Sequence, residues 1–162
     1  MRKIYRFLLK LKFWQYVLLF FGVFTAVNIA FSPLVDTTKL EEFFAKFPAV
    51  VVVLLSVVVA PIWETAIFQT LPLKYGYRLL KNRWSFRRCA YPLIVLSAVV
   101  FGINHSYSTS YIVAGVMMGL VFGFTYHVAR KRKQSATLTV MLIHASVNLI
   151  GTVGYIIERI MG

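Results

Sequence analysis

The sequence predicts an all-α protein, a polytopic membrane bundle of about five transmembrane helices that forms a single domain over residues 1–162. Composition is the first reason: 59% of the residues are hydrophobic, only 14% are charged, and the mean hydropathy is +0.74. A soluble domain has a very different balance. The second reason is segment length, because about 20 apolar residues span the hydrocarbon of a bilayer. Five stretches approach this length: residues 14–31, 47–73, 90 to about 106, 111–129 and 138–157.

The basic residues lie on alternate loops, which predicts the orientation of the bundle. All but three of the 18 Lys and Arg residues fall before the first span, between the second and third, or after the fourth; the exceptions are Lys39, Lys46 and Arg159. Because cytoplasmic loops collect Lys and Arg, we expect a cytoplasmic N-terminus and an external C-terminus. The net charge of +13 is therefore assigned to topology and to contact with anionic membrane lipids, and not to nucleic acid.

Start and stop signals lie between the spans. The Ser-Pro pair at residues 32–33 ends the first span, because proline removes a helical hydrogen bond. Residues 36–47 are expected to form a short amphipathic helix outside, with Thr37 or Thr38 as its N-cap. Residues 74–88 mix aromatic and basic side chains, a pattern typical of a segment lying along the cytoplasmic interface.

The fourth span carries a stripe of small residues. Gly115, Gly119 and Gly123 recur at intervals of four and so share one helical face. Small residues at this spacing let the backbone of a neighbouring helix approach closely. The stripe therefore predicts a tight helix pair, which could also bring polar groups of the two helices into register.

One carboxylate lies at membrane depth. Glu64 is the only charged residue in the stretch 47–73. Keeping an acid there costs about 2.5 to 3.5 kcal/mol on insertion scales, so it indicates a functional site. Two histidines, His105 and His144, and the amide of Asn148 lie in other predicted spans. An acid, two imidazoles and an amide on three different spans predict one polar site between helices.

Helical periodicity pairs several of these residues, because positions four apart share a face. His144 and Asn148 form one pair, and Phe101 and His105 form another. At about 1.5 Å per residue, Glu64 and His144 lie roughly 9 to 14 Å from the cytoplasmic ends of their spans. His105 lies nearer the external end of its span, so a tilt or a later helix start is needed to bring it to Glu64.

Three short motifs follow one another along the chain: Glu64 with Phe68, then Phe101-x-x-x-His105, then His144-x-x-x-Asn148. Their order resembles the motifs of the CPBP intramembrane protease family, also called the CAAX protease and bacteriocin-processing or Abi family. The likeness covers about residues 48–155, and the second and third motifs match in full. The first motif departs, because the family pattern is Glu-Glu-x-x-x-Arg and this chain has Thr65 and Gln69 at the second acid and the arginine.

The resemblance implies a glutamate-type endopeptidase that hydrolyses a peptide bond of a membrane-associated protein or peptide and requires no cofactor. Glu64, together with His105, would activate a water as general base, and His144 and Asn148 would donate hydrogen bonds to the tetrahedral oxyanion. Four residues would support them: Thr65, Phe68, Gln69 and Phe101. The implied location is an integral protein of a bacterial cytoplasmic membrane. Neither the substrate nor the oligomeric state follows from the motifs.

Two other readings stay open. Glu64, His105 and His144 have the composition of a three-ligand catalytic zinc site, which would make the protein a metalloenzyme. The altered first motif is also what a retired active site would look like. The chain would then be a non-catalytic member of the same fold that serves as an immunity factor, scaffold or chaperone for a membrane partner.

Overall fold

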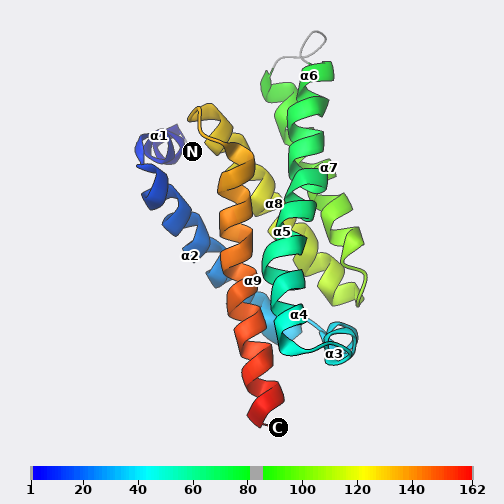
Figure 1. Ribbon diagram of the computed structural model, residues 1–162. Helices are drawn as coiled ribbons and strands as arrows, with labels where there is room; N and C mark the ends of the chain where they lie inside the picture. Colours follow the sequence, from blue (N-terminus) through cyan, green and yellow to red (C-terminus); the bar gives the residue numbers. More distant parts are fainter. Residues whose placement is uncertain (1, 81–85, 162) are drawn as a thin grey trace.

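The computed structural model describes residues 2–80 and 86–161, and every regular element within these residues is helical (Figure 1). The all-α class is therefore confirmed. In chain order the elements are α1 (Arg2–Lys10), α2 (Phe13–Phe31), η1 (Ser32–Leu34), α3 (Thr38–Ala45), α4 (Ala49–Val53), η2 (Leu54–Val59), α5 (Ala60–Glu64), η3 (Thr65–Gly76), α6 (Tyr77–Leu80), α7 (Phe86–Asn104), α8 (Thr109–Lys131) and α9 (Ala136–Met161).

Four helical stretches among the described residues are long and apolar enough to cross a membrane. They are Phe13–Leu34, Ala49–Leu80, Thr109–Lys131 and Ala136–Met161. The third predicted span is also present, as the 19-residue helix α7, but its apolar part Cys89–Asn104 is shorter than the other four. The chain is thus a polytopic helical bundle, in which the apolar part of α7 is shorter than each of the four candidate membrane spans.

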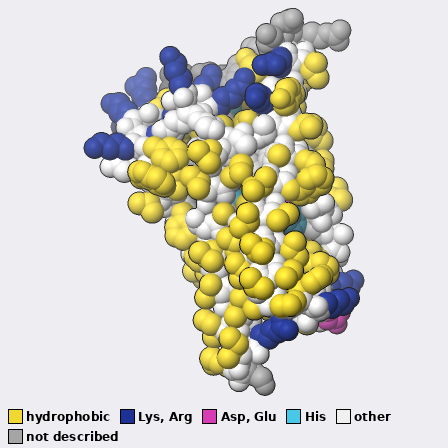
Figure 2. Space-filling model, viewed as in Figure 1, with side chains coloured by type: hydrophobic (Ala, Val, Ile, Leu, Met, Phe, Trp, Pro, Cys, Tyr) yellow, Lys and Arg dark blue, Asp and Glu magenta, His cyan; other side chains and the backbone are white. Residues whose placement is uncertain are grey.

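The two ends of the bundle carry different side chains. In Figure 1, α1, the end of α6 and the turn between α8 and α9 lie at one end, and α3 and the C-terminus lie at the other. Figure 2 shows most Lys and Arg side chains at the first end, a broad hydrophobic surface along the middle, and a small group of charges at the second end. The first end is the one that the positive-inside rule predicts to lie in the cytoplasm.

The orientation can be measured with single cysteines in a variant that lacks the native thiol, Cys89→Ser. We expect an impermeant thiol reagent applied to intact cells to label Lys39→Cys and Thr109→Cys, which lie at the end with α3, because that end faces outward. Gln134→Cys, in the turn before α9, should react only after the membrane is opened. Labelling of position 134 from outside would contradict the five-span orientation.

The N-terminal basic segment is a helix of its own, which the sequence analysis did not predict. Leu8 of α1 is buried, whereas Ile4 and Phe7 are exposed by 67% and 56%. The guanidinium of Arg132 donates to the carbonyl of Leu8 at 3.0 Å and to that of Leu11, so it caps the last turn of α1. Helix α1 is thereby tied to the turn between α8 and α9.

Residues 74–80 do not form a separate segment: the second membrane helix continues through η3 and α6 to Leu80, and α7 begins at Phe86. Their place at the cytoplasmic interface stays a prediction. A Cβ added to Gly76 would lie 2.9 Å from the side chain of Leu93, so the two helices pack closely near this end. Residues 81–85 lie outside the described part of the chain.

This longer helical hairpin removes the depth mismatch between Glu64 and His105. The second membrane helix ends, and α7 begins, at the same end of the bundle, so the two helices are antiparallel (Figure 1). Two contacts between them define their register. Ser97 donates its hydroxyl to the carbonyl of Phe68, and the rings of Phe68 and Phe101 meet edge to face at 5.8 Å. The same register, continued along the pair, brings His105 to Glu64.

The second membrane helix changes its winding on both sides of Glu64. The segments η2 and η3 are π-helical, and the short α-helix α5 between them ends at Glu64. At the end of η2, the N–H of Ala60 donates to the carbonyl of Leu55, five residues back. Pro61, the next residue, has no N–H to donate. Such wide turns occur frequently at functional sites.

The glycine stripe of α8 faces α7, as the sequence predicts. A Cβ added to Gly119 would lie 2.7 Å from the Cα of Ala98, and one added to Gly115 would lie 3.0 Å from the Cα of Gly102. Gly115 also lies close to the side chain of His105, at 3.5 Å from the added Cβ to the His105 Cβ. The close packing of α7 on α8 therefore fixes the position of one of the two site histidines.

Gly119→Ala should weaken this pair, because the new methyl group would meet backbone that must move. We expect the free energy of unfolding in detergent to fall by about 1 to 3 kcal/mol. Gly22→Ala on α2 is the matched control: nothing lies within 4 Å of a Cβ at that position, so this variant should be as stable as wild type or more stable, by up to about 1 kcal/mol. Equal stability of the two variants would contradict the packing described.

Candidate active site

Three titratable side chains from three membrane helices converge inside the bundle. The Oε2 atom of Glu64, at the end of α5, lies 3.6 Å from the Nε2 atom of His144 on α9. It lies 3.7 Å from the Nε2 atom of His105, in the turn that follows α7. The structure thus brings together the acid and both histidines that the sequence singles out, around one carboxylate oxygen.

The cluster is nearly closed to its surroundings. The side chains of Glu64, His105 and His144 are exposed by only 12%, 16% and 5%. Charged groups interact far more strongly in such an environment than in water. Of the three side chains, those of His105 and Glu64 keep a small exposed fraction, and that of His144 is the most deeply buried.

The imidazole of His105 is held in a defined tautomer by the backbone. Its Nδ1 atom lies 2.8 Å from the carbonyl oxygen of Phe101, one helical turn back, so Nδ1 must carry the hydrogen. In the neutral ring the Nε2 atom is then an acceptor, and this is the atom that faces Glu64. The spacing of four residues therefore lets the backbone carbonyl of Phe101 orient the ring of His105.

Aromatic rings form the wall behind the two imidazoles. The ring of Phe101 lies 4.4 Å from that of His105 and 6.0 Å from that of His144, between centroids. Phe68 packs on Phe101 and completes this wall. Phe122 of α8, which the sequence motifs do not include, also belongs to this wall, because its ring lies 4.5 Å from that of His144. In the sequence, Phe122 is marked only by its place beside Gly123 of the glycine stripe. Helical periodicity does not distinguish such a residue from an ordinary core residue.

Asn148 lies on the same helix as His144 but makes a different contact. Its Nδ2 atom donates to the carbonyl oxygen of Ser56 at 2.8 Å. The hydroxyl of Ser56 in turn lies 2.8 Å from that of Thr152. Among the described residues, no hydrogen bond joins Asn148 to Glu64 or to either histidine. In this structure the amide therefore links α9 to η2 rather than to the carboxylate.

The two residues that depart from the family pattern are fully buried. Thr65 and Gln69 both have zero exposure, on the face of η3 that is turned toward the bundle interior. The hydroxyl of Thr65 and both polar atoms of the Gln69 amide have no hydrogen-bond partner within the described residues, and neither has the Nδ1 atom of His144. An unpaired buried polar group costs about 1 to 3 kcal/mol, so this part of the core is polar at a price in stability.

No three His, Cys, Asp or Glu side chains in residues 2–80 and 86–161 are arranged so as to hold a metal ion. Zinc would need nitrogen and oxygen ligands about 2.0 to 2.2 Å from the metal. The zinc alternative is put to a direct test below, by chelation.

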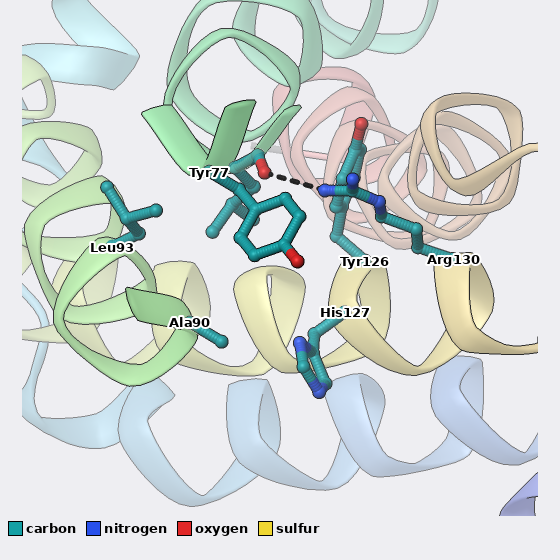
Figure 3. A pocket seen from close by; sticks show the side chains of 7 residues that line it. Tyr77, Ala90, Leu93, Tyr126, His127 and Arg130 are labelled. Atoms are coloured by element: carbon teal, nitrogen blue, oxygen red, sulfur yellow. Dashed lines mark hydrogen bonds between the residues drawn. The ribbon is translucent and has the colours of Figure 1, made fainter. Parts of the chain in front are cut away.

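A separate pocket lies nearer the end of the bundle that carries α1 and α6, between α6, α7 and α8 (Figure 3). Arg130 closes one side of it: its Nη1 atom donates to the carbonyl oxygen of Leu73 at 3.0 Å, and its guanidinium lies over the ring of Tyr77 at 4.7 Å. None of the three clustered side chains lines this pocket. The arginine therefore braces the helix ends and does not take part in the cluster around Glu64.

The fold and the cluster together define a class of protein: a polytopic helical membrane protein with an acid and two imidazoles enclosed between its helices. Comparison with known families narrows the class. The family model for type II CAAX prenyl endopeptidase, Rce1-like, matches residues 46–150, which is more than half of the chain. The chain belongs to this Rce1-like family of CAAX-type proteases. No curated protein and no solved structure matches it significantly.

Proposed function

We propose that the protein is an intramembrane endopeptidase in which Glu64 acts as general base on a water molecule. The observation that carries the proposal is the convergence of both Nε2 atoms on one oxygen of Glu64, at 3.6 and 3.7 Å. These separations exceed a direct hydrogen bond, for which about 3.2 Å is the usual limit for nitrogen and oxygen. They suit a water that contacts all three groups.

The hydrogen-bonding capacity of the cluster supports this role. Glu64 accepts one hydrogen of the water, and the Nε2 atom of His105, an acceptor in the tautomer held by Phe101, accepts the other. Both hydrogens then point into the protein, and a lone pair of the water oxygen points away from them toward a substrate carbonyl. A positioned base of this kind contributes about 100 to 10,000-fold in rate.

The full reaction needs only water and the peptide. Glu64 takes a proton as the water oxygen bonds to the carbonyl carbon, and the carbonyl electron pair moves onto its oxygen. When the tetrahedral species collapses, the C–N bond breaks and the leaving nitrogen takes the proton back from Glu64. The imidazole of His144 is available as a donor to the developing oxyanion, and one such donor contributes about 100 to 1,000-fold. The substrate is a membrane-associated protein or peptide, since the cluster lies between membrane helices.

The proposal can be tested without knowing the substrate. Cells expressing the wild-type protein should show new protein N-termini, mapped by chemical labelling and mass spectrometry. These termini should be absent with Glu64→Gln and present with Glu158→Gln, which removes a carboxylate from the external end of α9 instead. Identical sets of termini in wild-type and Glu64→Gln cells would overturn the proposal.

Chelation separates this mechanism from a zinc enzyme. We expect EDTA or 1,10-phenanthroline to leave turnover of the purified protein within about twofold, because the base in this mechanism is a carboxylate and no step uses a metal-bound water. A zinc site would instead lose its activity with its metal and regain it on addition of zinc. Zinc-reversible inhibition would therefore replace the proposal with the metal alternative.

One observation favours the second candidate, a non-catalytic scaffold of the same fold. The first motif lacks an acid and an arginine, and the residues in their place, Thr65 and Gln69, leave buried polar atoms unpaired. A scaffold does not need a base, so it should keep its cellular function with Glu64→Gln. Loss of function in that variant, with normal folding and insertion, would exclude the scaffold.

A further inference from the structure

Two tyrosines that the motifs do not include lie beside the cluster. The ring of Tyr111, in the first turn of α8, lies parallel to that of His105, with an interplanar angle of 9° and centroids 5.9 Å apart. The ring of Tyr107, in the turn between α7 and α8, meets Tyr111 edge-on at 5.2 Å. The two tyrosines therefore follow one another outward from the His105 ring, Tyr111 first and Tyr107 beside it.

The position of Tyr111 is fixed by a capping arrangement. Its backbone N–H donates to the hydroxyl oxygen of Ser108 at 3.1 Å, the N-cap contact of α8. The Ser108 hydroxyl donates in turn to the carbonyl oxygen of Asp36 at 2.9 Å. The segment that precedes α3 therefore fixes the start of α8, and with it the backbone from which the Tyr111 ring packs on His105.

The two phenol groups are free to donate. Among the described residues, no hydrogen bond engages the hydroxyl of Tyr107 or that of Tyr111. Burial, and to a smaller extent the Glu64 charge, raises the pKa of Tyr107. A protonated phenol is a hydrogen-bond donor. The His105 side of the cluster thus has two phenol donors that no other described residue uses.

One N–H of the Asn148 amide donates to the backbone of the second membrane helix, for a reason built into that helix. In the π register the carbonyl of Ser56 would receive the N–H of residue 61, five positions on, just as Leu55 receives the N–H of Ala60. Residue 61 is proline and has no N–H. Asn148 supplies the missing donor to Ser56, and releasing it would leave a backbone carbonyl unpaired inside the bundle.

We propose that Tyr111 is a catalytic residue of this site, a hydrogen-bond donor to the oxyanion formed from the substrate carbonyl, with Tyr107 packed beside it as a second donor. This inference rests on the proposed function. In the addition step the new C–O bond forms to water, the proton passes to Glu64, and the carbonyl oxygen gains the electron pair. The phenol O–H of Tyr111 shares its hydrogen with that oxygen and keeps it, so no proton is transferred to or from the tyrosine.

The test compares Tyr111→Phe with wild type in liposomes. It uses a quenched-fluorescent peptide with a farnesylated cysteine three residues before its C-terminus. Phenylalanine keeps the ring against His105 and removes only the hydroxyl. We expect kcat to fall about 100-fold with KM nearly unchanged, because the bond strengthens in the transition state. Tyr107→Phe should show a smaller loss of the same kind. Tyr91→Phe is the matched control, an exposed phenol on α7 beside His127.

A second readout separates catalysis from structure. The same peptide with a hydroxyethylene unit in place of the scissile amide mimics the tetrahedral species, and Tyr111→Phe should weaken its inhibition by about the factor lost in kcat/KM. Asn148→Ala should lower the unfolding temperature, because it unpairs Ser56. If Tyr111→Phe turns over within about twofold of wild type while Glu64→Gln is inactive, the inference fails and the proposed function stands. If Glu64→Gln cleaves the peptide at the wild-type rate, both fail.

Discussion

Replacing Glu64 by glutamine should lower kcat at least about 100-fold while leaving the protein folded and inserted. Glutamine has the shape of the glutamate side chain but cannot take a proton from water. The change also removes a buried charge from the space between the two imidazoles, so the thermal stability of the variant in detergent should not fall. The measurement is turnover of the purified protein in liposomes, beside the unfolding temperature of the same sample.

Two comparisons make that result specific to the base. Glu158→Gln changes a carboxylate at the external end of α9 and should retain wild-type turnover. Glu64→Asp keeps the base but draws it back by about one methylene, so it should retain part of the activity lost in Glu64→Gln. Near-normal turnover by Glu64→Gln would refute the assignment of Glu64 as the base.

The second large effect is expected at the altered first motif. Thr65→Glu alone, or Gln69→Arg alone, places an unpaired charge in fully buried surroundings and should reduce the free energy of unfolding by about 3 to 5 kcal/mol. Positions four apart on a helix can meet, so the double variant should recover much of the loss as an ion pair. Thermal unfolding in detergent of the two single variants and the double variant gives the coupling free energy.

Neutral substitutions provide the control for this cycle. The polar atoms of Thr65 and Gln69 have no partner in the described chain, so Thr65→Val and Gln69→Leu remove groups whose burial is already unfavourable. We expect these variants to be as stable as wild type or more so. Strictly additive losses in the charged cycle would show that the two positions do not meet.

The class of fold and the core of the site could be predicted from the sequence for clear physical reasons. A bilayer dictates the length and composition of its spans, so the five apolar stretches stand out. An acid at membrane depth is costly enough to need a reason, which singles out Glu64. The order of the three motifs added His105 and His144 to the predicted site. The family model that matches residues 46–150 confirms the family that these motifs resemble.

What the sequence could not provide depends on register between helices. The contact of Asn148 with Ser56 exists because Pro61 interrupts a π-helical ladder, and no residue pattern distinguishes that winding from an ordinary helix. Tyr111 and Tyr107 lie at the edge of a span, where tyrosine usually marks the membrane interface. Only the folded structure reveals that the Tyr111 ring faces His105 and that the Tyr107 ring packs on Tyr111.

Glu64 should activate water for hydrolysis and form no bond to the substrate. A single turnover in H₂¹⁸O distinguishes these two roles, with the protein in excess over a peptide substrate and both products analysed by mass spectrometry. We expect one ¹⁸O atom in the new carboxylate of the peptide and none in the tryptic fragment that contains Glu64. An ¹⁸O label in the side chain of Glu64, or a peptide product without ¹⁸O, would contradict this expectation.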